Sequence, residues 1–314
     1  MAGEGVPDPP LVVIVGPTAV GKTTLSIELA VALGGEVVSA DSRLVYRGMD
    51  IGTAKPTVEE RSRVPHHLID IADPDQVVSV AQYQQSAYQA IDSIHQRGRI
   101  PFLVGGSGQY VRSVVQGWKV PPVVANPGLR SELEAQARQH GADSLHAQLV
   151  RLDPTGAARI DARNVRRVVR ALEVFMTTGR SVGAQTKSPP PYRLYQVGFI
   201  RARPALYARI DERIDSMLRN GLVDEVRGLL DAGYGLELPS MSGLGYRQIG
   251  WYLTSKWTLD EAVSGMRRGT RRFARQQSTW FRADDPGIRW FDLACDDAAG
   301  VLRSVSRFLD LMPL

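Results

Sequence analysis

The chain has 314 residues, of which 43% are hydrophobic and 23% are charged, and a formal net charge of +5, which suits a globular protein of one or two folding units. Its apolar runs fall far short of the roughly 20 residues that cross a bilayer, and its first ten residues lack the pattern of a secretory signal. One cysteine, Cys295, excludes an internal disulfide or a multi-cysteine metal site, so we expect a cytoplasmic protein.

The first part of the chain alternates between short apolar runs and helical segments. Strands are predicted over 11–15, 36–40 and 100–104, and helices over 23–33, over 80–97 and after Gly106. Such alternation predicts a parallel sheet covered by helices on both faces.

A proline-rich stretch, 119–127, interrupts this alternation. The segment that follows contains only helical patterns, predicted over 129–140, 143–149, 155–160 and 165–177. A strand over 194–200 then resumes the sheet, a long helix opens at Pro204, and a late strand over 288–293 precedes a terminal helix. We therefore predict a core of residues 1–118 and 190–314 and a helical insertion domain of residues 119–189.

The sequence GPTAVGKT lies directly after the first predicted strand and opens a helix. Its glycines let backbone amides turn toward a phosphate, its lysine adds a charge, and its last hydroxyl can hold Mg²⁺. The motif predicts an α/β fold with a P-loop NTPase-like parallel sheet flanked by helices. The residues predicted to bind a diphosphate or triphosphate are Gly16, Pro17, Thr18, Ala19, Val20, Gly21, Lys22 and Thr23.

The acid that would accompany this loop is less clearly specified. A kinase or ATPase needs an acidic residue after an apolar strand, but the strand over 100–104 runs into the sequence GGSG. Asp41 follows the second strand, at the edge of the sheet that faces the ligand crevice. A small-molecule kinase also places a substrate-orienting acid there, and a helix N-cap is a further interpretation.

Arginines gather in three places. The segment 266–282 holds six arginines and no acid, and a helix over 258–282 would place them on an outward arc of about 140°. Five more arginines lie between 159 and 170. Arg209 and Arg213 lie one turn apart on the helix after Pro204, where the alternatives are an anionic ligand and ordinary surface ion pairs. Arginine suits bidentate contacts with phosphate, so these clusters favour an anionic partner.

The ordered motifs, taken together, resemble the tRNA dimethylallyltransferase family over roughly residues 11–293. They are GPTAVGKT (16–23), SADSRLVYRGMDIGTAKP (39–56), PHHLIDIADP (65–74), LVGGSGQY (103–110), NVRRVVRALEVF (164–175), SGLGYRQ (242–248) and RQQSTWFR (275–282). The chain departs from the family at Ser107, where threonine is usual, and at Gln276, where a basic residue is frequent.

The resemblance implies transfer of a dimethylallyl group from dimethylallyl diphosphate to the exocyclic amine of the adenosine 3′ to the anticodon. Asp41 would accept the proton of this amine, and Ser107 would hydrogen-bond the adenine or the transferring group. Arg209 and Arg213 would bind the diphosphate, with Mg²⁺ held by Thr23. Asp41, Thr23, Ser107 and Arg213 are therefore the predicted catalytic residues.

The resemblance also implies that the anticodon arm of tRNA is the macromolecular partner. We expect a monomeric enzyme that binds no membrane. The predicted tRNA-binding residues are Asp41, Ser42, Arg43, Leu44, Ser107, Arg130, Arg166, Arg167, Arg170, Gly245, Tyr246, Arg247, Arg268, Arg271, Arg275, Gln277 and Trp280. Two rival hypotheses are a small-molecule or nucleotide kinase that uses ATP and a P-loop nucleic-acid-binding protein without catalysis. Both leave part of the pattern unexplained: a kinase would not need the arginine clusters, and a binding protein would not need Asp41 and Ser107 at neighbouring strand ends.

Overall fold

The computed structural model describes residues 8–119, 123, 126–181, 187–188 and 190–310. The chain divides into two compact units, Met1–Val115 with Pro190–Leu314, and Gln116–Pro189. Among the described residues, no helix is both long enough and apolar enough to cross a membrane.

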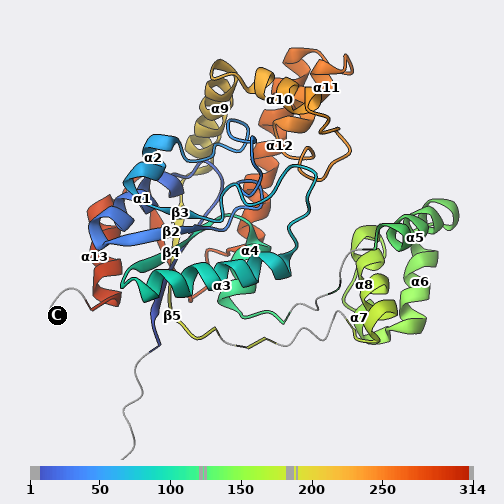
Figure 1. Cartoon of the computed structure of the whole chain (residues 1–314), viewed down its shortest axis with the longest axis horizontal. Coiled ribbons are helices and arrows are strands. Elements are labelled where there is room, and N and C mark those ends of the chain that lie inside the picture. Colours follow the sequence, from blue (N-terminus) through green and yellow to red (C-terminus); the bar gives the residue numbers. More distant parts are fainter. Residues whose placement is uncertain (1–7, 120–122, 124–125, 182–186, 189, 311–314) are drawn as a thin grey trace, which may run out of the picture. The chain divides into compact units, whose positions relative to one another are not determined.

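The first unit contains a parallel sheet of six strands in the order β3-β2-β4-β1-β5-β6 (Figure 1). This confirms the predicted α/β fold with a parallel sheet. The short edge strand β3 is not among the predicted strands. The strands are β1 (Pro10–Val15), β2 (Gly35–Ser39), β3 (His66–His67), β4 (Ile100–Gly105), β5 (Arg193–Ile200) and β6 (Ile288–Asp292).

Helices cover the sheet, and α1 and α3 both pack against β2 and β4, from opposite faces (Figure 1). Helix α9 packs against α12, which ends two residues earlier than predicted. The helices of this unit are α1 (Lys22–Leu33), α2 (Val58–Arg63), α3 (Val80–Gln96), α4 (Gly108–Val115), α9 (Arg203–Arg219), α10 (Leu222–Asp231), α11 (Tyr246–Leu253), α12 (Leu259–Trp280) and α13 (Ala298–Phe308).

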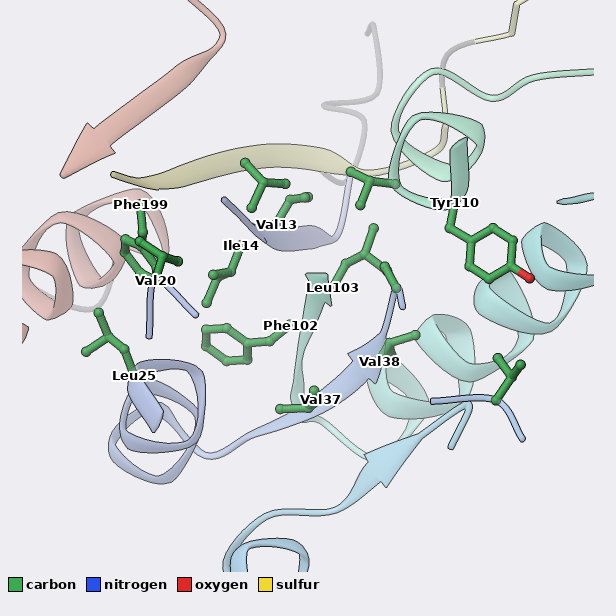
Figure 2. Close-up of a cluster of buried hydrophobic side chains, with 14 of the residues drawn as sticks. Val13, Ile14, Val20, Leu25, Val37, Val38, Phe102, Leu103, Tyr110 and Phe199 are labelled. Carbon is green, nitrogen blue, oxygen red and sulfur yellow. The ribbon is translucent and has the colours of Figure 1, made fainter. Parts of the chain in front are cut away.

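The core of this unit lies around the two central strands. Figure 2 shows Val13 and Ile14 of β1 beside Phe102 and Leu103 of β4, all four fully buried. Because a parallel sheet is covered on both faces, its central strands read as continuous apolar runs instead of alternating ones. The rigid centre fixes the positions at which β1, β2 and β4 end, and these ends share one edge of the sheet.

The described part of the second unit is made mainly of helices (Figure 1). It comprises α5 (Pro127–His140), α6 (Ala142–Leu152), the single turn α7 (Pro154–Ala157) and α8 (Val165–Thr178). Its own small core contains Leu133, Leu145, Leu149, Val168 and Leu172. A separate core allows this unit to keep its fold through its own contacts.

Candidate active site

The loop between β1 and α1 is curled by two glycines and a lysine. Gly16 and Gly21 have φ angles of 149° and 117°, which side-chain-bearing residues rarely adopt. A Cβ on Gly16 would also lie 2.7 Å from the carbonyl oxygen of Phe199. Lys22 Nζ donates hydrogen bonds to the carbonyls of Gly16 and Pro17, both at 2.9 Å. The loop is therefore held in the concave shape that anions bind.

This loop lines a cavity of about 460 Å³ together with side chains from distant parts of the chain. Asp41 enters from the end of β2, and Arg209 and Arg213 enter from α9. Arg209 Nε donates to the carbonyl of Ala19 at 2.9 Å, and Arg213 Nη2 donates to the carbonyl of Thr53 at 3.2 Å. Both guanidinium groups thus point to the cavity wall and contact backbone carbonyls instead of the surface acids of the alternative interpretation.

The electrostatics of the cavity favour an anionic ligand. Burial lowers the pKa of Lys22 from 10.5 to about 8, although the negative charge of Asp41 opposes this shift and Arg213 assists it. Burial also lowers the pKa of Arg213, again against the attraction of Asp41. Lysine and arginine side chains with lowered pKa values lack a full set of counter-charges. A diphosphate would supply the missing negative charge.

Asp41 lies in a turn, not at the start of a helix. Its Oδ1 atom accepts a hydrogen bond from the amide of Arg43 at 2.9 Å, which closes the turn and orients the carboxylate. No helix begins at this point, since residues 42–45 form turns. The helix N-cap interpretation is therefore wrong, and Asp41 belongs to the wall of the cavity.

Ser107 connects two strand ends. Its Oγ accepts a hydrogen bond from the amide of Ser42 at 2.9 Å, and its own amide donates to the carbonyl of Ala40 at 3.2 Å. Ser107 is therefore hydrogen-bonded to the residues on either side of Asp41, Ala40 and Ser42, where the ends of β2 and β4 meet. A contact between Ser107 and a substrate stays a prediction.

Comparison with known proteins agrees with this geometry. The family model described as IPP transferase matches residues 44–284. The chain belongs to the IPP transferase family. Among curated relatives, the tRNA dimethylallyltransferase of Roseiflexus sp. (strain RS-1) is 55% identical over 274 residues, which cover 87% of this chain and 90% of that protein. The tRNA dimethylallyltransferase of Thermomicrobium roseum is 50% identical over 285 residues, covering 90% and 86%.

Two solved structures are similar over almost the whole chain. The tRNA isopentenylpyrophosphate transferase from Bacillus halodurans has a TM-score of 0.72 and 44% identity, covering 96% of this chain and 97% of its own. A eukaryotic dimethylallyltransferase acting on tRNA has a TM-score of 0.82 and 26% identity, covering 98% and 81%. These matches confirm the resemblance drawn from the sequence motifs and the P-loop NTPase-like fold predicted from the motif GPTAVGKT.

Two residues predicted to bind tRNA lie inside this IPP transferase. Gln277 is 4% exposed; it accepts the amide proton of Thr18 at 2.8 Å and donates to the carbonyl of Gly106 at 3.0 Å. Tyr246 is 1% exposed and donates to Glu225 at 2.6 Å. Both side chains therefore hold the walls of the site, because their polar atoms are engaged by the protein itself.

The remaining predicted tRNA contacts of the first unit differ in exposure. Gly245 is buried, and the indole of Trp280 is partly buried against Gly108 and under Arg112. Arg247 is exposed and lies over the ring of Trp251. Three residues that follow β2 are half-buried: Ser42, Arg43 and Leu44. The Arg43 guanidinium donates hydrogen bonds to the backbone carbonyls of Pro239 and Ser240.

The expectation that six arginines form one outward stripe on α12 is wrong. Arg267 pairs with Asp215 at 2.6 Å, and Arg271 pairs with Asp211, so this part of the arc faces α9. Arg275 donates to the hydroxyl of Tyr207 at 2.9 Å. The helix ends at Trp280, so Arg282 is not on it and pairs instead with Asp284 at 2.8 Å. Arg268, Arg272 and Arg275 are exposed on α12, and so is the apolar side chain of Phe273, at 39%.

In the second unit, one buried carboxylate engages two of the arginines predicted to bind tRNA. Glu173 is fully buried and accepts hydrogen bonds from Arg130 at 2.8 and 2.9 Å, from Arg170 at 2.5 Å and from the amide of Asn126 at 2.8 Å. Burial alone would raise its pKa, but these donors lower the pKa of Glu173 to about 2. Arg130 and Arg170 are therefore structural ion-pair partners, whereas Arg166 and Arg167 are exposed.

Proposed function

We propose that this chain transfers a dimethylallyl group from dimethylallyl diphosphate to the exocyclic amine of the adenosine 3′-adjacent to the anticodon in tRNA, which gives isopentenyladenosine. The observation that carries this proposal is the single cavity in which a phosphate loop, two arginines and Asp41 meet. A reaction whose leaving group is diphosphate cleaves no γ-phosphoryl group. It therefore explains why the apolar strand β4 ends in glycines instead of an acid.

The loop and its cations bind the diphosphate and stabilise its departure. Negative charge grows on the leaving oxygen as the carbon–oxygen bond breaks. Lys22, Arg209, Arg213 and the loop amides surround the cavity in which that charge would develop. Such fixed donors accelerate the reaction because they need no reorganisation in the transition state.

Asp41 accepts the proton that the amine loses. The lone pair of the exocyclic amine is delocalised into the adenine ring, so the amine is a weak nucleophile. As its nitrogen bonds the allylic carbon, one N–H proton passes to the Asp41 carboxylate, which the amide of Arg43 holds in place at 2.9 Å. A general base of this kind contributes about 10²–10⁴ to the rate. Ser107, fixed by the amide of Ser42, would orient the adenine or the transferring group.

A magnesium ion would enter with the diphosphate. Within the described ranges, no group of three or more His, Cys, Asp or Glu side chains could hold a metal by itself. The exposed hydroxyl of Thr23 lines the cavity at the start of α1. One protein hydroxyl fits Mg²⁺, which keeps several waters and relies on phosphate oxygens. When bound, the ion would neutralise charge on the leaving diphosphate.

The anticodon arm of tRNA would contact exposed arginines of both units. These are Arg247, Arg268, Arg272 and Arg275 in the first unit and Arg166 and Arg167 in the insertion. Backbone contacts of this type supply affinity, whereas extrusion of the target base from its stack brings the amine to Asp41. We expect the chain to act as a monomer in the cytoplasm.

Label transfer without ATP tests this function against its rivals. The full chain is incubated with Mg²⁺, unmodified tRNA and dimethylallyl diphosphate labelled in its five-carbon group, and the tRNA is digested to nucleosides. Label on adenosine is the expected result. Phosphorylation that requires ATP would favour the kinase, and tRNA binding without any transfer would favour the binding protein.

A further inference from the structure

Glu225, on the first turn of α10, binds an entire turn of backbone. Its Oε2 atom accepts hydrogen bonds from the amides of Asp50 at 3.0 Å and Ile51 at 2.7 Å, and its Oε1 atom accepts one from the amide of Gly52 at 3.1 Å. Three consecutive backbone amides therefore converge on one side chain. No sequence motif pointed to this residue.

Tyr246 completes the arrangement from α11. Its hydroxyl donates to Glu225 Oε1 at 2.6 Å, so the carboxylate has four donors. Burial and the neighbouring negative charge of Glu225 raise the pKa of Tyr246, which keeps the phenol protonated as a donor. The Tyr246 ring also packs so closely on Gly52 that a Cβ there would lie 2.5 Å from it. We name this arrangement the Glu225 clamp: the Glu225 carboxylate, the Tyr246 hydroxyl and the amides of residues 50–52.

The segment held by the Glu225 clamp leads directly into the wall of the diphosphate cavity. Thr53 and Ala54 line that cavity, and the carbonyl of Thr53 accepts the hydrogen bond from Arg213. On the far side, the Lys55 ammonium is buried against the carbonyl of Tyr46 at 2.7 Å and is paired with Asp50 and Asp70. The wall is thus fixed on both sides of Thr53: the Glu225 carboxylate binds the residues before it, and the Lys55 ammonium anchors the residues after it.

We propose that Glu225 is a positioning residue that sets the orientation of Arg213 toward the diphosphate. This inference rests on the proposed function of the cavity. The carboxylate fixes residues 50–52, these place the Thr53 carbonyl, and that carbonyl orients the guanidinium. A carboxylate is required because both of its oxygens accept and neither donates, whereas the amide of glutamine would oppose an N–H group to an N–H group. The Glu225→Gln substitution therefore preserves size and removes the arrangement of acceptors.

The test measures binding of inorganic diphosphate with Mg²⁺ to the full chain by calorimetry, so that it does not depend on any transfer reaction. For Glu225→Gln we expect the dissociation constant to rise about tenfold, and for Tyr246→Phe to rise less, since one donor of four is lost. Ile94→Val serves as the control for lost stability. Ile94 is fully buried near the end of α3, by the edge of the sheet where β4 begins, and its variant should bind diphosphate normally.

A double-mutant cycle separates positioning from a general loss of structure. If Glu225 acts through Arg213, then Glu225→Gln should weaken diphosphate binding in the native background and hardly at all in an Arg213→Gln background. Additive losses would overturn the inference, as would native affinity in Glu225→Gln. Failure of the unaltered chain to bind diphosphate would instead contradict the proposed function of the cavity.

Discussion

Replacement of Asp41 by asparagine should nearly abolish turnover while leaving the cavity intact. The Oδ1 atom accepts the amide of Arg43 at 2.9 Å, and the carbonyl of an asparagine can accept the same hydrogen bond. The turn and the position of the side chain should therefore persist. What disappears is a group able to take a proton from the exocyclic amine.

The magnitude follows from the role of the lost group. A general base contributes about 10²–10⁴ to a rate, which corresponds to about 3–5 kcal/mol in the activation free energy. The loss should fall on kcat, because the carboxylate acts mainly in the transition state. The negative charge of Asp41 also raises the pKa of Lys22. In the variant this pKa should be lower, so the loss of diphosphate affinity with rising pH should begin at a lower pH than in the native chain.

Single-turnover transfer to tRNA at pH 7, under saturating dimethylallyl diphosphate, isolates the chemical step. Calorimetry with inorganic diphosphate at the same pH checks that the cavity of the variant still binds its anion. A variant that retained more than about a tenth of the native rate would refute the general-base role, because that loss lies below the usual contribution of a general base.

Four other outcomes follow from the structure. Lys22→Ala and Thr23→Ala should each weaken binding of dimethylallyl diphosphate and also lower kcat by about tenfold or more, and an unchanged kcat in both would show that the loop only positions the ligand. Because the pKa of Lys22 is lowered to about 8, its ammonium is present below that pH and is lost above it; calorimetry should show diphosphate affinity falling through pH 8, and Lys22→Ala should lack this transition. Because the pKa of Glu173 is lowered from 4.5 to about 2, its contribution to stability is full above pH 4.5 and is lost as the pH falls toward 2. Glu173→Ala should lower the free energy of unfolding by about 3 kcal/mol, seen in the full chain as faster amide hydrogen exchange over 127–178, and unaltered exchange would contradict this. The double variant Arg268→Ala with Arg272→Ala should reduce the salt dependence of tRNA affinity in filter binding, whereas a native slope would mean that these side chains are merely solvated.

The elements of this fold were largely predictable because their patterns are local. Continuous apolar runs marked the central strands, and Pro204 together with an apolar stripe of Leu206, Ile210 and Ile214 marked α9. The edge strand β3 has only two residues, too few to leave a periodic signal, and its pairing with β2 depends on contacts that no local pattern encodes.

The parts of the candidate site that could be predicted are those in which a reactive residue type directly follows a predicted strand. The phosphate loop and Asp41 each follow a predicted strand, so topology alone brings them to one edge of the sheet. The partners of the arginines were not predictable, because they come from other elements: Asp211 of α9 pairs with Arg271 of α12, and Glu173 pairs with Arg130 across the second unit. A helical projection shows the side of the helix on which a charge lies, but not which element covers that side.

The central claim is that the exocyclic amine of one adenosine is the nucleophile, and one measurement tests it most directly. Two anticodon stem–loops are compared with the full chain, Mg²⁺ and labelled dimethylallyl diphosphate: one carries adenosine 3′ to the anticodon, and the other carries purine riboside, which lacks the amine. We predict one five-carbon unit on that adenosine, no transfer to purine riboside, and similar binding of the two stem–loops. Label on the purine riboside stem–loop, or label at another nucleotide of the adenosine stem–loop, would contradict the claim.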